Sequence, residues 1–159
     1  MNIELKNIKH SEFASQETHC FEATLYVDGK RFCLVSNDGN GGCDNYYPIK
    51  RTDGSVYNGV KAINKKLAAE HEDINLEIVV GNLVNKWLQD KEIKKILRRI
   101  SYIKNGSLYQ QPARVKPTAK NLELIQKAPW WLPDNILISG LSVEDARAQL
   151  ATINLFGEL

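Results

Sequence analysis

The sequence has few cysteines and no long apolar run. Its 159 residues include three cysteines, Cys20, Cys33 and Cys43, an odd number without a CxxC pair. This pattern argues against a disulfide framework and favours free thiols in a reducing compartment. No apolar run approaches the ~20 residues that span a bilayer, and the segment MNIELKNIKH lacks the apolar stretch of a signal peptide. We therefore expect a soluble, cytoplasmic protein with no membrane partner.

The sequence also lacks the phosphate and calcium motifs that a glycine-rich loop can form. Residues 36–55 are rich in glycine and turn-forming residues, but no GK[ST] follows and they do not open directly into a helix, as a phosphate loop does. Counted from Asp38, the sixth and twelfth residues are Cys43 and Ile49, where a calcium loop of the EF-hand type has glycine and glutamate. We predict a turn-rich connector without a bound ion or cofactor.

No set of cysteines and histidines has the spacing of a zinc site. The register predicted for the first hairpin sets Cys33 opposite Thr24, roughly 13 Å along the sheet from Cys20, which is too far for ligands of one ion. His19 and Cys20 are neighbours in the sequence and could be drawn as a base and a nucleophile. Neighbouring strand residues point to opposite faces, however. We therefore expect no metal, and a cysteine-dependent enzyme ranks lowest among the functions considered.

Two alternating segments around Asp28-Gly29 predict a β-hairpin. The runs FEATLYV and KRFCLVS flank a dipeptide that a two-residue type I′ turn prefers. This turn pairs Val27 with Lys30, and one face of the hairpin then carries five apolar residues that we expect to face the core. They are Phe21, Ala23, Leu25, Phe32 and Leu34, with Thr24, Tyr26, Arg31 and Cys33 on the other face. The preceding NIELKNIK is predicted to be a third strand.

The remaining sequence alternates between helical patterns and short strands. Apolar spacings of three and four predict helices at residues 56–71 and 75–99, the second being either one continuous helix or two helices that meet near Gln89-Asp90. Asn105-Gly106 predicts a second short hairpin that pairs Tyr102 with Tyr109. A helix at 118–127, a strand at 135–139 and a last helix capped by Ser142 follow. The apolar stripe of the second helix is predicted to be Val79, Leu83, Trp87, Ile93, Ile96 and Ile100.

These elements predict one α+β domain, residues 1–159. In this fold an N-terminal antiparallel hairpin or small sheet packs against amphipathic helices, and a second short hairpin and a C-terminal helix follow. A chain of this length can bury roughly two thirds of its unfolded surface. No internal repeat or proline-rich linker divides it.

Positive charge is concentrated in one segment. Residues 86–120 hold ten Lys or Arg and only Asp90 and Glu92 as acidic residues, a net charge of +8 in a chain of net charge +2. Residues 1–45 and residues 121–159 each carry a net charge of −3. Such segregation steers a protein toward a polyanion or an acidic protein face.

This basic segment is the first candidate for a binding surface. Its charges lie on the polar side of the predicted second helix and continue beyond it, interleaved with Trp87, Tyr102 and Tyr109. Rings among cations are typical of proteins that bind single-stranded nucleic acid, although a charged helix face is often only solvated. The candidate residues are Lys91, Lys94, Lys95, Arg98, Arg99, Lys104, Arg114 and Lys116. Trp130-Trp131 is a further candidate contact, because two adjacent tryptophan side chains are hard to bury together; packing over the edge of the core is the alternative and ranks above it.

The glycine-rich loop is the second candidate surface. Glycines allow close backbone approach to a partner, and loops often carry binding residues. A mobile contact loop would use Asn37, Asp38, Gly39, Asn40, Gly41 and Gly42. A simple connector is the alternative interpretation.

The same region carries a resemblance. ETHCFEATLYVDGK followed by SNDGNGGCDNYYP resembles small, uncharacterised proteins of bacteriophages and related mobile elements, in which a Thr-His-Cys-Phe strand, an Asp-Gly turn and an Asn-Asp-Gly-X-Gly-Gly loop recur. The resemblance covers about residues 3–48. It implies no activity. It implies a setting in the cytoplasm of an infected bacterium and a small protein that binds host or phage macromolecules.

Two binding functions follow from these observations. The first is a non-enzymatic accessory protein that contacts a host or phage protein. The alternative is a protein that binds DNA or RNA on its basic surface, with little base specificity because no reader motif is present.

Overall fold

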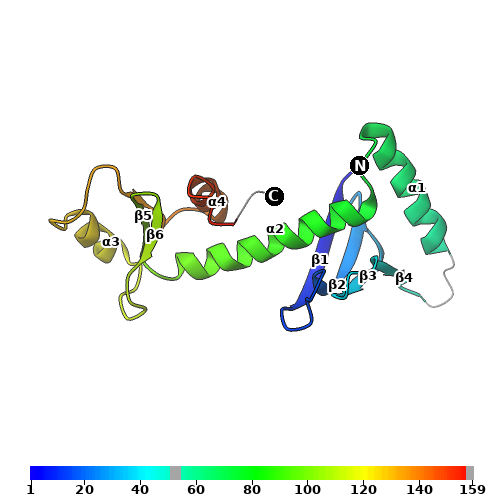
Figure 1. The fold of residues 1–159 in the computed structure, drawn as a ribbon, viewed down its shortest axis with the longest axis horizontal. Coiled ribbons are helices and arrows are strands. Elements are labelled where there is room, and N and C mark those ends of the chain that lie inside the picture. Colours follow the sequence, from blue (N-terminus) through cyan, green and yellow to red (C-terminus); the bar gives the residue numbers. More distant parts are fainter. Residues whose placement is uncertain (51–54, 157–159) are drawn as a thin grey trace. The chain divides into compact units, whose positions relative to one another are not determined.

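The computed structural model describes residues 1–50 and 55–156 and has an α+β fold, as predicted (Figure 1). The end of the predicted glycine-rich connector, residues 51–54, lies outside the described residues. The chain forms two compact units, residues 1–86 and residues 87–159. They are called the N-terminal unit and the C-terminal unit below. The single domain predicted from the sequence requires that both units unfold together, which an unfolding experiment tests.

The N-terminal unit contains a four-stranded antiparallel sheet. Its strands are β1 (Ile3–Ser11), β2 (Cys20–Val27), β3 (Lys30–Asp38) and β4 (Asn45–Tyr47), in the order β1-β2-β3-β4. The predicted third strand is therefore confirmed as β1. Between β2 and β3, Asp28 and Gly29 have φ values of 47° and 75°, the positive values that a type I′ turn requires at both central residues.

The predicted core face of the hairpin is only half right. Val27 pairs with Lys30 as predicted, but a bulge at Phe32 then shifts the register, so that Leu25 pairs with Cys33 rather than with Phe32. A bulge adds one residue to one strand and turns every later side chain to the other face. The ring of Phe32 lies against Gly59 of the first helix, where an added Cβ would come within 2.7 Å of it. The core side is consequently Phe21, Ala23, Leu25, Cys33 and Val35, while Leu34 is 40% exposed.

Two helices complete the N-terminal unit. Helix α1 (Ser55–Glu70) buries Val56, Ile63 and Leu67. Helix α2 (Leu76–Leu97) is continuous through Gln89-Asp90, the first of the two alternatives that the sequence left open. In the first half of α2 the fully buried residues are Leu76, Val80 and Val84, not the predicted Val79, Leu83 and Trp87. The segment IVVGNLV is apolar at neighbouring positions, and its periodicity therefore fits either stripe.

The C-terminal unit contains the second half of α2 and a three-stranded sheet. Strands β5 (Ser101–Lys104), β6 (Ser107–Gln110) and β7 (Ile136–Leu137) lie in the order β6-β5-β7. Tyr102 pairs with Tyr109, as the Asn105-Gly106 turn predicted. The unit also holds α3 (Ala119–Gln126) and α4 (Val143–Ala151), whose N-caps are the predicted Thr118 and Ser142. Its buried core is Ile93, Ile96, Ile103, Ile138, Ala146 and Leu150.

None of the helices within the described ranges has the length and apolar character that crossing a bilayer requires.

Candidate functional site

Half of the predicted basic residues converge on one groove. Along α2 and the turn that directly follows it, positions 87, 90, 91, 94, 95 and 98 recur at spacings of three and four, so their side chains lie on one side. They line a groove of about 310 Å³ whose residues are Trp87, Asp90, Lys91, Lys94, Lys95 and Arg98. The four cations are all exposed, and the ammonium of Lys91 lies 5.3 Å from the ring centroid of Trp87. We call this surface the α2 groove.

The acidic residues near the α2 groove are held by specific cations. Asp90 accepts an ion-paired hydrogen bond from Arg147 of α4, which also donates to Gln89. Glu92 pairs with Lys95 at 2.7 Å. The charge of Asp90 is thus balanced by a residue that does not line the groove. Lys91, Lys94 and Arg98 leave the groove with an excess of positive charge, and no ion pair within the described part of the chain involves any of these three.

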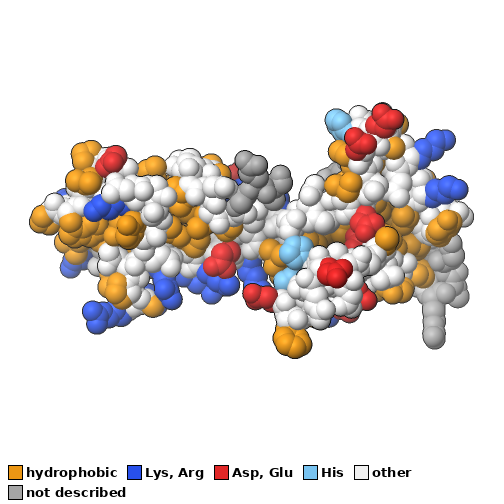
Figure 2. All heavy atoms as spheres, in the orientation of Figure 1, with side chains coloured by type: hydrophobic (Ala, Val, Ile, Leu, Met, Phe, Trp, Pro, Cys, Tyr) orange, Lys and Arg blue, Asp and Glu red, His pale blue; other side chains and the backbone are white. Residues whose placement is uncertain are grey.

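The other predicted cations belong to the same unit but not to the α2 groove. Arg99 is exposed at the end of α2, Lys104 is half-buried at the end of β5, and Arg114 and Lys116 are exposed after β6. Figure 2 shows Lys and Arg side chains gathered along the lower side of the C-terminal unit in that view. The segregation of charge in the sequence is therefore also present on the surface.

The C-terminal unit also contains an aromatic cluster of four rings. Tyr102 is 7% exposed and stacks on Tyr109, with 5.7 Å between ring centroids and an interplanar angle of 13°. Trp130 and Trp131 lie against Tyr102 at centroid distances of 5.6 and 5.4 Å. Tyr109 and Trp130 nevertheless remain 46% and 41% exposed. The prediction that the two tryptophans are not both buried is confirmed.

The sequence indicated these four rings separately but could not bring them together. Tyr102 and Tyr109 follow from the hairpin register. Trp130 and Trp131 reach them from beyond α3, and no local pattern in the sequence specifies that contact.

The glycine-rich loop is fixed by hydrogen bonds within the N-terminal unit. Asn37, 6% exposed, accepts from the Gly39 N–H and the Thr18 hydroxyl and donates to Gly42 O and the Asp44 carboxylate, at 2.8 to 3.0 Å. The carbonyl of Gly39 accepts three N–H groups, from residues 16, 17 and 18. Gly39 has φ 88°, and a Cβ there would lie 2.1 Å from a backbone oxygen, so the position requires glycine.

The predicted loop residues are therefore divided between two environments. Asn37 and Gly39 are buried and organise the loop. The exposed members are Asp38, Asn40, Gly41 and Gly42.

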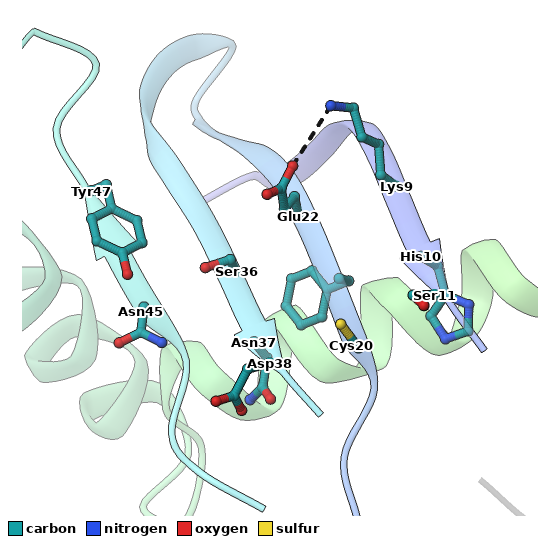
Figure 3. A pocket seen from close by; sticks show the side chains of 11 residues that line it. Lys9, His10, Ser11, Cys20, Glu22, Ser36, Asn37, Asp38, Asn45 and Tyr47 are labelled. Atoms are coloured by element: carbon teal, nitrogen blue, oxygen red, sulfur yellow. Dashed lines mark ion pairs between the residues drawn. The ribbon is translucent and has the colours of Figure 1, made fainter. Parts of the chain in front are cut away.

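A pocket on the outer face of the N-terminal sheet was not predicted. It has a volume of about 530 Å³ and is lined by residues of all four strands, with α2 behind the sheet (Figure 3). Ser11, Cys20 and Asp38 form one row across neighbouring strands, and Lys9 pairs with Glu22 at 3.6 Å. Within the described residues, no group of three or more His, Cys, Asp or Glu side chains is placed to hold a metal ion.

His19 and Cys20 are directed to different surroundings. His19 Nε2 donates to Asn85 Oδ1 of α2 at 2.6 Å, whereas Cys20 lines the outer pocket without His19. Adjacency in the sequence thus does not make a nucleophile and base of this pair.

Burial shifts the ionisation of three groups in the N-terminal unit. It raises the pKa of Cys33 from 9.0 to about 12, because the thiolate would be formed away from water. It also raises the pKa of Asp44, although the hydrogen bond from Asn37 opposes the shift. Burial, reinforced by the charge of Asp44, raises the pKa of Tyr46. A thiol that stays protonated in this way is a packing residue rather than a nucleophile.

Comparison of the chain with models of protein families, with curated proteins and with solved structures gives no match.

Proposed function

We propose that this is a non-enzymatic nucleic-acid-binding protein that holds the phosphate backbone of DNA or RNA in the α2 groove. The observation that carries the proposal is the convergence of four exposed cations on one groove in which Asp90, the one carboxylate among the described lining residues, is paired with Arg147. Backbone phosphates are bound mainly by Lys and Arg, and such contacts carry little sequence information.

The geometry favours nucleic acid over the protein-docking hypothesis for one reason. Docking relied partly on a mobile glycine-rich loop, and the polar groups of Asn37 and Gly39 are used inside the loop itself. A host or phage protein remains the second candidate partner. The exposure of Trp130 and Leu132, 41% and 42%, favours it, because tryptophan is enriched among the residues that anchor protein interfaces.

The proposed setting is the cytoplasm of a bacterium, in which a phage-type accessory protein would meet both host and phage nucleic acid. The resemblance of residues 3–48 and the three free cysteines support this setting.

Binding to a fluorescent single-stranded oligonucleotide, measured by anisotropy as salt is raised from about 50 mM, tests the proposal. If four cations contact phosphates, log K falls with log salt at a slope of about −3. Replacing the four groove cations Lys91, Lys94, Lys95 and Arg98 by serine should abolish most of the binding and flatten the slope. The matched control replaces four exposed lysines of the N-terminal unit, Lys30, Lys61, Lys65 and Lys66, and should retain the slope.

Equal losses in the two quadruple variants would mean that net charge, not the α2 groove, attracts the ligand. Absence of binding to single- and double-stranded DNA and RNA at about 50 mM salt would rule the proposal out. A pull-down from lysate that recovers a stoichiometric protein through Trp130 would then support the second candidate.

A further inference from the structure

The two stacked tyrosines of the C-terminal unit differ in exposure. Tyr102 is buried and covers one face of Tyr109 in a nearly parallel stack. Tyr109 nevertheless keeps 46% of its surface exposed. Among the described residues, no ring other than Tyr102 contacts Tyr109, so the stack of rings ends at Tyr109. Trp130 and Trp131 hold Tyr102 from other directions, which fixes the ring on which Tyr109 rests.

Cations lie on both sides of Tyr109 in the chain. Lys104 stands two residues after Tyr102 on β5 and therefore on the same side of the sheet. Arg114 and Lys116 are exposed on the segment that follows β6. A ligand that stacks on Tyr109 would therefore lie on the same side of the sheet as Lys104. A planar ring joined to a negatively charged chain is complementary to both features.

We infer that Tyr109 is a base-stacking platform, and that the ligand of the C-terminal unit is a single-stranded nucleic acid whose unpaired base stacks on this ring. The inference rests on the proposed function and adds a second subsite, because the α2 groove takes phosphates and Tyr109 takes a base. Stacking on an aromatic ring requires a base that is not already stacked in a duplex, and it tolerates any base because each has a π-face. The surface therefore selects single strands over duplexes without reading a sequence.

Two oligonucleotides of equal length and charge separate the subsites. One is a dT strand of about 20 nucleotides, and the other is the same strand with abasic residues in place of the bases. We expect the wild-type protein to bind the dT strand about tenfold more tightly than the abasic strand, and more tightly than a duplex of equal length. Tyr109→Ala should bring the dT affinity down to the abasic value and leave abasic binding unchanged.

Two variants control for the ring and for general effects. Tyr109→Phe keeps the ring and should keep the preference for bases. Tyr57→Ala removes a tyrosine of α1 that is 77% exposed, and it should leave the affinity for both strands unchanged. The comparison of the two strands on wild-type protein needs no variant to fold, so the inference stays testable if Tyr109→Ala is unstable.

Each outcome has a distinct meaning. Equal wild-type affinity for the dT and abasic strands would overturn the stacking inference and leave the phosphate-binding proposal standing. No affinity for either strand would overturn both. Equal affinity for the dT strand and a polyglutamate chain of matched charge would also overturn both, since it would show that any polyanion of that charge binds and that neither bases nor phosphates are selected.

Discussion

The two units of this chain differ in how they use their polar groups. The N-terminal unit has ten basic and twelve acidic residues and the C-terminal unit has eleven and seven, which gives net charges of −2 and +4. In the N-terminal unit, conspicuous polar residues such as Asn37 and His19 are hydrogen-bonded inside the unit. In the C-terminal unit, several conspicuous cations and rings remain exposed, among them Lys91, Lys94, Arg98, Tyr109 and Trp130. The comparison teaches that a group already satisfied within its fold is structural, whereas a group left exposed is available to a partner.

The largest expected effect is the loss of stability when a core residue is truncated, and it shows whether the two units behave as one domain. Ile138 in the C-terminal unit and Leu25 in the N-terminal unit are both fully buried, and replacing either by alanine should lower the free energy of unfolding by about 2–5 kcal/mol. All three tryptophans lie at positions 87, 130 and 131, so tryptophan fluorescence reports the C-terminal unit. Protection of the buried Cys33 thiol reports the N-terminal unit.

A single domain requires that Ile138→Ala shift both probes to the same urea midpoint. If Ile138→Ala moved only the fluorescence transition and Leu25→Ala only the thiol transition, the units would be two domains.

The next prediction concerns alkaline pH and the N-terminal unit alone. The pKa of Cys33 is raised from 9.0 to about 12 in the folded chain, so above pH 9.0 the unfolded chain loses a proton that the folded chain retains. The contribution of Cys33 to stability is therefore constant below this pH and is lost as pH rises from 9.0 toward 12. Tyr46, whose pKa is also raised by burial, contributes in the same direction.

This fall in stability is measured by following the protection of the Cys33 thiol during urea unfolding, and the urea midpoint should be lower at alkaline pH than at neutral pH. Cys33 should also resist iodoacetamide at neutral pH while the exposed Cys43 reacts. Rapid labelling of Cys33 in the folded protein would contradict the burial on which the prediction depends.

A smaller loss of stability is expected in the glycine-rich loop, where it separates residues that hold the loop together from residues that are free to contact a partner. Asn37→Ala removes four hydrogen bonds and leaves buried groups unpaired, which should cost about 1–3 kcal/mol. Asn40→Ala, at an exposed position of the same loop, should change stability by less than about 0.5 kcal/mol. Neither variant should alter oligonucleotide affinity. A specific loss of affinity in Asn40→Ala would instead show that the loop binds, as the sequence alone suggested.

The fold was predictable where a short segment decides the geometry. Asp28-Gly29 and Asn105-Gly106 specify their turns because few residues accept positive φ, and Thr118 and Ser142 cap helices through their own hydroxyls. The bulge at Phe32 was not predictable, since it depends on the space beside Gly59 of α1. Helix α2 was placed correctly, but its buried stripe in the N-terminal unit depends on the sheet against which it packs.

The candidate site was predictable in composition but not in arrangement. Helical periodicity alone brings Lys91, Lys94, Lys95 and Arg98 to one face. The pairing of Asp90 with Arg147 joins residues far apart in the chain, and it is this pair that leaves the α2 groove cationic. The assembly of Tyr102 with Trp130 and Trp131 depends on tertiary packing in the same way.

The smallest expected effect is the loss of stability on removing a helix cap in the C-terminal unit. The hydroxyl of Ser142 accepts the Asp145 N–H at 3.1 Å and donates to the Asp145 carboxylate at 2.7 Å. Ser142→Ala should lower the free energy of unfolding by about 1 kcal/mol, whereas Ser142→Asn, which can still accept the N–H, should lose only part of it. Urea unfolding followed by tryptophan fluorescence measures both, with Ser107→Ala at an exposed strand position as the control. Helix α4 also supplies Arg147, but it is packed through the fully buried Ala146 and Leu150. We therefore expect Ser142→Ala to leave the oligonucleotide affinity unchanged. A fall in affinity without urea would mean that the cap positions Arg147 against Asp90.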